Sequence, residues 1–183
     1  DGDTSTPIRV FYMGLNTEKF RTSVWGSNGT VASTNVSTTI TDGLWHHIAF
    51  TYESGKLNQY VDGVVDATEQ TSCTGDLNDA DTELWFGKRV GGSLFAITGH
   101  MAQVVMYDAT LSAGQIKAIY DKGIDGDHSS DDNLVGFWKM DNASTLTDLS
   151  SNSNNGTAVG DPTLVRNTVT LDSTSNNNDG NLL

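Results

Sequence analysis

The apolar residues of this chain come in short runs, and turn-forming Gly, Asn, Asp and Ser residues separate them. Runs of this kind, rich in β-branched and aromatic residues, are typical of β-strands. The Asp62-Gly63 pair predicts a two-residue hairpin turn, because such turns need a positive φ at both central positions. Strands at this spacing, with no helical pattern between them, predict an antiparallel sandwich or barrel. The expected strands are 8–12, 20–25, 48–52, 57–61, 84–86, 101–107 and 134–140.

One helix is predicted near residues 112–122. Ser112 and Gln115 have the spacing of a capping box, in which each side chain binds the backbone N–H of the other residue. Gly123 supplies the residue that commonly ends a helix. Apolar residues, among them Ile116, fall on one face, so we expect this helix to lie on a sheet.

Charge and cysteine content exclude several classes of function. The chain has 183 residues, 10 Lys and Arg against 23 Asp and Glu, and a formal net charge of −13. Such a surface repels phosphate backbones and anionic membranes, so no nucleic acid partner is expected. No apolar run approaches the roughly 20 residues that span a bilayer, so no membrane insertion is expected either. A single cysteine, Cys73, excludes an internal disulfide framework and a multi-cysteine zinc site.

Three segments carry a resemblance to a known family. They are Asp42-Gly-Leu-Trp-His-His-Ile-Ala-Phe-Thr-Tyr52 with Lys56 to Gly63 behind it, then Leu84 to Arg89, then Gly99 to Tyr120. In order and spacing they resemble the central and closing strands of the laminin-G-like (concanavalin A-like lectin/glucanase) jelly-roll family, over about residues 8–123. The resemblance implies an all-β fold: an antiparallel jelly-roll β-sandwich with one short helix.

The opening segment of that family lies downstream here instead of upstream, as 134–141 and 148–156. We therefore expect three parts. Residues 1–123 form a core that lacks the family's usual N-terminal strands, residues 124–133 form an acidic linker, and residues 134–183 form a set of Asn/Ser/Thr-rich strands. The last strands either complete the sandwich, in the same chain or in a neighbouring subunit, or open a second unit. We favour pairing, because an exposed edge carrying Phe137 and Trp138 would promote aggregation.

The resemblance implies a non-catalytic adhesion or recognition module, with a glycan as the expected ligand. We expect it on an extracellular, cell-surface or virion-surface protein, beside neighbouring subunits or repeats. An alternative is a structural assembly subunit that pairs through its C-terminal strands. A less favoured alternative is a glycoside hydrolase, because Asp79, Asp81 and Glu83 alternate as glucanase carboxylates do. We interpret that segment as an acidic turn.

Asp148, Asn152 and Asn154 are the candidate metal ligands, with calcium as the possible cofactor. They lie in the loop 148–156, which is repeated in the loop 172–180. Ca²⁺ takes six to eight oxygen ligands, and alternating Asp, Ser and Asn residues offer such oxygens. The alternative is that these Asn-Gly loops form turns without metal.

Other candidate residues have structural interpretations. His46 and His47 are neighbours, and on a regular strand they face opposite sides and cannot share one ion. His100 and His128 have no companion at ligand spacing, and Cys73 is expected to be an inert thiol. The aromatic residues Trp25, Tyr60 and Trp85 could stack on a sugar, although strand aromatics more often belong to a core.

Overall fold

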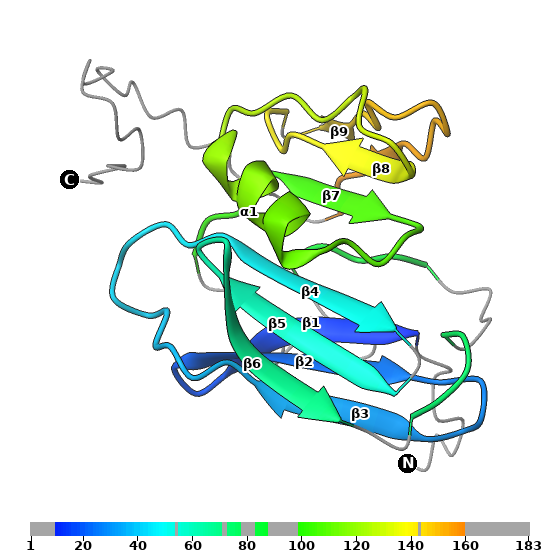
Figure 1. The fold of residues 1–183 in the computed structure, drawn as a ribbon. Helices are drawn as coiled ribbons and strands as arrows, with labels where there is room; N and C mark the ends of the chain where they lie inside the picture. The colour runs from blue at the N-terminus through cyan, green and yellow to red at the C-terminus, as the bar shows by residue number, and fades with distance from the viewer. Residues whose placement is uncertain are drawn as a thin grey trace, which may run out of the picture. The chain divides into compact units, whose positions relative to one another are not determined.

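The computed structural model describes residues 10–53, 55–70, 73–77, 83–87, 99–142 and 144–159. The chain divides into two compact units, residues 1–98 and 99–183. The first unit holds strands β1–β6, and the second holds strands β7–β10 and helix α1 (Figure 1). The described structure is mostly β with one short helix, as the sequence predicts.

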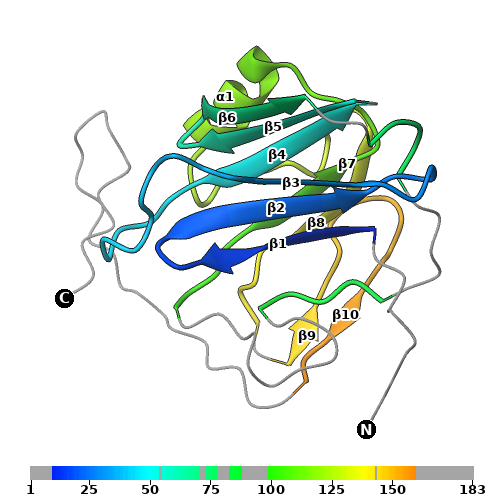
Figure 2. The same cartoon turned by 90° about the horizontal axis from the view of Figure 1, so that it is seen from below.

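Two antiparallel sheets form the first unit. One has the order β1-β2-β3, with β1 at Phe11–Asn16, β2 at Lys19–Trp25 and β3 at Val31–Asn35. The other has the order β4-β5-β6, with β4 at Ile48–Glu53, β5 at Lys56–Val61 and β6 at Val64–Gln70. Figure 2 shows β1–β3 as a continuous twisted sheet. Each connection within a sheet is short, so sequential strands pair with one another.

The β5–β6 hairpin confirms the turn predicted from Asp62-Gly63. Asp62 has φ 51° and Gly63 has φ 75°, the two positive values that the turn requires. Further along the ladder, the register shifts between Gln59 and Tyr60, which leaves Asp66 unpaired in β6. The Asp66 carboxylate accepts hydrogen bonds from the backbone of Ser37 and Thr38, and so anchors the segment that follows β3.

The core of the first unit lies between its two sheets. Val24 of β2, Ala32 of β3 and Leu57 of β5 are completely buried together with Cys73. Burying a side chain such as Leu57 contributes roughly 1.5–3 kcal/mol. A buried hydrogen bond of 2.7 Å from Gln59 Nε2 to Thr22 Oγ1 also joins the two sheets.

The second unit contains two short ladders and the helix. Strand β7, Val104–Tyr107, pairs antiparallel with β8, Leu134–Trp138. Strand β9, Thr145–Leu146, pairs antiparallel with β10, Gly156–Thr157. Helix α1, Ala113–Asp121, begins after Ser112 with the predicted capping box: Ser112 Oγ accepts from Gln115 N, and Gln115 Oε1 accepts from Ser112 N.

Some expected elements differ from those observed. Residues 84–86 were expected as a strand, but this expectation is wrong: the segment 83–87 is irregular and has no ladder partner in the described part of the chain. The strand expected at 101–107 is shorter, because β7 begins only at Val104. The segment 134–138 pairs with β7 in the same chain. Whether residues 134–183 complete the first sandwich or open another unit stays a prediction. Of the described helices, none is long and apolar enough to cross a membrane.

Candidate functional site

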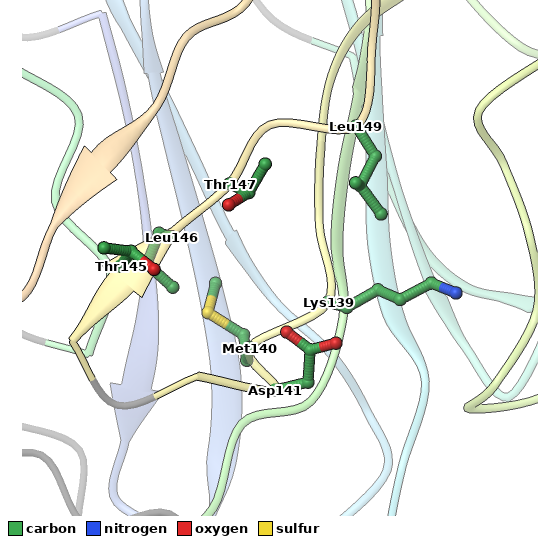
Figure 3. Close-up of a pocket in the computed structure, with 7 residues that line it drawn as sticks. All are labelled: Lys139, Met140, Asp141, Thr145, Leu146, Thr147 and Leu149. Atoms are coloured by element: carbon green, nitrogen blue, oxygen red, sulfur yellow. The ribbon is translucent and has the colours of Figure 1, made fainter.

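A small hollow opens in the second unit where the chain leaves β8 and turns through β9. Its volume is about 210 Å³. Figure 3 shows the side chains that surround it, and they combine charged, hydroxyl and apolar groups. The lining residues are Lys139, Met140, Asp141, Thr145, Leu146, Thr147 and Leu149.

The backbone at Met140 is unusual and places the residues on either side. Met140 has φ 55°, in the left-handed region that a residue with a side chain seldom adopts. Such conformations cost free energy and concentrate at functional sites. The turn separates Lys139 from Asp141, and Figure 3 shows the Asp141 carboxylate directed toward the middle of the lining residues while the Lys139 ammonium extends away from it.

The hollow combines hydrogen-bonding and apolar side chains. The Asp141 carboxylate accepts hydrogen bonds only, whereas the hydroxyls of Thr145 and Thr147 both donate and accept. Leu149, whose side chain is 39% exposed, adds apolar surface that water would otherwise cover. Four of the seven lining residues are polar or charged, so the hollow is more polar than the usual ligand pocket.

The loop beside the hollow is organised by Asp148, the first predicted calcium ligand. Asp148 is buried, with 6% of its surface exposed. Its Oδ1 accepts from the backbone N–H groups of Phe137 and Ser150, both at 2.9 Å. Its Oδ2 accepts from Ser150 Oγ and Asn154 N, both at 2.8 Å. Burial alone would raise the pKa of this carboxyl, but these bonds outweigh burial and the pKa is lowered.

The other two predicted ligands lie in the same loop. Asn152 Nδ2 donates to Val135 O at 3.0 Å, and Asn154 Nδ2 donates to the same carbonyl at 3.2 Å. The structure therefore brings the three predicted residues together around the start of β8. An ionised carboxylate has about four lone-pair positions, and at Asp148 all four receive protein donors. These contacts fit a hydrogen-bonded loop better than a cation site, and calcium stays a prediction.

A cluster around Asp131 was not anticipated from the sequence. The Asp131 carboxylate accepts from Tyr107 OH at 2.7 Å, contacts His128 Nδ1 at 2.8 Å and pairs with Lys122 Nζ at 2.6 Å. Burial would raise the pKa of Asp131, but these three partners lower it to about 2. Burial, with Asp131 next to its hydroxyl, raises the pKa of Tyr107. His128 is 1% exposed and packs edge-on against Phe137, so part of the segment 124–133 is fixed within the second unit.

His46 lies between two carboxylates in the first unit. Its Nδ1 is 2.9 Å from Asp62 Oδ2 and its Nε2 is 3.2 Å from Asp42 Oδ1. Burial lowers the pKa of His46, but the two carboxylates more than compensate and the pKa is raised. Because Asp62 also accepts from His47 N at 2.9 Å, the arrangement ties the residues before β4 to the β5–β6 turn. Within the described residues, no group of three or more His, Cys, Asp or Glu side chains is placed to hold a metal ion.

The remaining sequence candidates are dispersed. Asp79, Asp81 and the loop 172–180 lie outside the described residues, and Glu83 accepts a hydrogen bond from Trp85 Nε1 at 3.0 Å. Tyr60 is buried in the first unit, with 3% exposure, whereas Trp85 is 37% exposed. No sequence motif marked the hollow or the Asp131 cluster. Asp141, which lines the hollow, is the last residue of the segment 134–141 that resembles the family's opening segment.

Two solved structures of other proteins are similar to this chain in fold. None of the curated proteins matches the chain. A candidate carbohydrate-binding protein from Bacteroides ovatus is similar in structure, with a TM-score of 0.59 and 19% identity over 76% of this chain. This chain spans 40% of that protein. An S-layer domain-containing protein from Clostridium thermocellum is similar at a TM-score of 0.37 and 17% identity, covering 64% of this chain and 59% of that one.

A family model gives the assignment. The laminin-G-type model of the concanavalin A-like lectin/glucanases superfamily matches residues 2–117. This match confirms the resemblance found in the sequence, together with the jelly-roll sandwich that the family implies. The superfamily contains both lectins and glucanases. Since the matched residues make up more than half of the sequence, the chain belongs to the concanavalin A-like lectin/glucanases superfamily.

Proposed function

We propose that the chain is a non-catalytic carbohydrate-binding module. The observation that carries the proposal is the hollow beside β8 and β9, which combines a carboxylate, two hydroxyls and apolar side chains in a member of a lectin-containing superfamily. The name of the Bacteroides ovatus protein adds support through the shared fold, although at 19% identity the likeness shows the fold alone.

The same hollow supports binding over hydrolysis. Glycosidases of the usual kind need two carboxyl groups about 5–9.5 Å apart, one to protonate the leaving group and one to act as nucleophile or base. Among the residues that line the hollow, Asp141 is the single carboxylate. Of the alternating acids considered above, the described one, Glu83, is engaged by the Trp85 indole.

We further propose that the module acts in recognition or adhesion outside the cell, on a cell or virion surface. Its acidic composition, with a net charge of −13, suits an extracellular or saline environment and keeps the chain soluble there. Immunolabelling of intact cells or particles from the source would test the location, and signal only after permeabilisation would contradict it.

A glycan array probed with the whole labelled chain tests the proposed function. Runs with 2 mM Ca²⁺ and with a chelator in excess also test the calcium prediction. We expect reproducible binding to a related subset of glycans. Absence of binding in both conditions would refute the carbohydrate function. Incubation with β-glucans, using Asp81→Asn and Glu83→Gln as controls, would refute the non-catalytic assignment if turnover appears and either variant abolishes it.

Structural assembly is the second candidate function. The observation in its favour is that β7 and β8 form a ladder of two strands, with no third strand beside it in the described residues. Among the described residues, each strand therefore has an edge without a ladder partner, with which a neighbouring copy could pair. The molecular mass of the intact chain, measured by light scattering across a concentration series, decides it: a monomer throughout would reject assembly between copies.

A further inference from the structure

We propose that the hollow beside β8 and β9 binds one ring of a neutral sugar, with the Asp141 carboxylate accepting hydrogen bonds from adjacent sugar hydroxyls. This inference rests on the proposed carbohydrate-binding function and adds the size and charge of the ligand and the residue that recognises it.

Asp141 is available for a ligand. Within the described residues, no hydrogen bond or ion pair engages its carboxylate, and Figure 3 shows that group directed toward the middle of the hollow. At Asp148, by contrast, protein donors occupy all four acceptor positions of the carboxylate. A free carboxylate can accept from two neighbouring hydroxyls at once, and such charge-assisted bonds are stronger than neutral ones.

The charge distribution selects neutral sugars over acidic ones. Lys139 lines the hollow, but its Nζ lies 5.8 Å from the centre of the Phe137 ring, and its charge acts on Asp127. Figure 3 shows the Lys139 side chain extending away from Asp141. A uronic or sialic acid would bring its own carboxylate toward Asp141 in a chain of net charge −13, and like charges at short range repel.

The remaining lining residues complement a sugar ring. Thr145 and Thr147 carry hydroxyls that both donate and accept, as sugar hydroxyls do. Met140, Leu146 and the partly exposed Leu149 offer apolar surface to the C–H face of the ring. The volume of about 210 Å³ is below the roughly 300–1,000 Å³ of pockets for drug-sized ligands, so a ligand held there is no larger than about one sugar ring.

The test combines direct binding with matched variants of the full chain. Methyl glucoside, methyl galactoside and methyl mannoside would be titrated to tens of millimolar, with glucuronic and sialic acid as acidic comparators. Backbone amide signals in two-dimensional NMR report where each sugar binds. The variant Asp141→Asn removes the charge and keeps the shape. Asp132→Asn removes the same charge from an exposed position in the same unit that does not line the hollow.

We expect at least one neutral glycoside to shift signals of residues 139–149, with a Kd of about a millimolar that Asp141→Asn weakens about tenfold and Asp132→Asn leaves unchanged. Thr147→Ala should give a smaller loss and serves as a second variant if Asp141→Asn lowers the melting temperature. Stronger binding of the acidic sugars would overturn the ligand class. The proposed site would be wrong if Asp141→Asn left glycan binding on the array unchanged, or if the sugars shifted only NMR signals of other residues. Either result would still be compatible with the proposed function. No binding on the array would remove the proposed function itself.

Discussion

The substitution Asp148→Asn separates a loop held by hydrogen bonds from a loop held by calcium. The carboxylate of Asp148 accepts four hydrogen bonds, from Phe137 N, Ser150 N, Ser150 Oγ and Asn154 N. Asparagine has nearly the same shape but only one oxygen. That oxygen can keep the bonds from Phe137 and Ser150, while the new NH₂ group faces the N–H of Asn154.

The expected cost follows from these contacts. Two charge-assisted bonds are lost, those from Ser150 Oγ and Asn154 N, a donor then opposes the Asn154 N–H, and the site is buried. We therefore expect a loss of about 2–4 kcal/mol in the free energy of unfolding. In a unit of this size, 1 kcal/mol moves the melting temperature by roughly 4–8 °C, which predicts a fall of about 8–32 °C. Ser150→Ala removes the hydroxyl that binds Asp148, Val135 O and Asn152 N but leaves the carboxylate in place, so it should cost less, about 1–2 kcal/mol.

Differential scanning calorimetry of the wild-type chain and both variants, each with excess chelator and with 2 mM Ca²⁺, measures these differences. We expect the order wild type, Ser150→Ala, Asp148→Asn in both buffers, with equal spacing. A ligand that binds only the folded state raises the melting temperature as its concentration rises. If chelation lowers the wild-type melting temperature as far as the substitution does, and leaves Asp148→Asn unchanged, the hydrogen-bond argument is refuted and the calcium prediction is supported.

Three further predictions concern charges and buried polar groups. The raised pKa of His46 means that its stabilising contribution is complete below about pH 6.5 and is lost as pH rises through the folded value, so His46→Gln should abolish an alkaline fall in stability seen in urea titrations. Asp131 has a pKa of about 2 in the folded protein, against a usual value of 3.8. After allowance for solvent screening, the wild type should therefore lose about 1–2 kcal/mol in the free energy of unfolding as pH falls from 4 to 2. Asp131→Asn should not show this loss. Gln59 Oε1 is buried without a hydrogen-bond partner in the described structure, and Gln59 Nε2 donates to Thr22 Oγ1. Thr22→Val alone leaves that donor without its acceptor and should lower the free energy of unfolding by about 1–3 kcal/mol. Thr22→Val combined with Gln59→Leu removes both partners and should lower it by clearly less than the sum of the single changes. An additive double variant would contradict this last expectation.

The elements that the sequence predicted correctly depend on chemistry within a few residues. The hairpin at Asp62-Gly63 follows from the φ values that only certain residues adopt readily, and the structure has both. The helix start follows from Ser112 and Gln115, which are three residues apart and bind each other's backbone. In both cases the partners are neighbours in the chain, so the spacing alone contains the geometry.

The clusters that the sequence did not reveal depend on chain segments that meet only after folding. Asp131 is reached by Tyr107 from 24 residues away and by Lys122 from nine, and no spacing rule connects these positions. His46 similarly meets Asp62 across 16 residues, through the β5–β6 turn. The strand expected at Leu84–Phe86 is wrong for a related reason: an apolar run forms a strand only if a neighbouring strand supplies its hydrogen bonds, and none of the described strands does so here.

The acidic surplus was open to two interpretations in the sequence, as a coat that keeps the chain soluble and as a source of ligands. The structure divides the carboxylates by what they contact. Asp62, Asp131 and Asp148 each accept hydrogen bonds from chain segments distant in sequence, so their charges hold local structure and are not available to a ligand. Asp141 is exposed and has no such bond among the described residues. Because its oxygens are the ones left without protein donors in the described structure, Asp141, and not the loop at 148–156, is where ligand binding should be sought first.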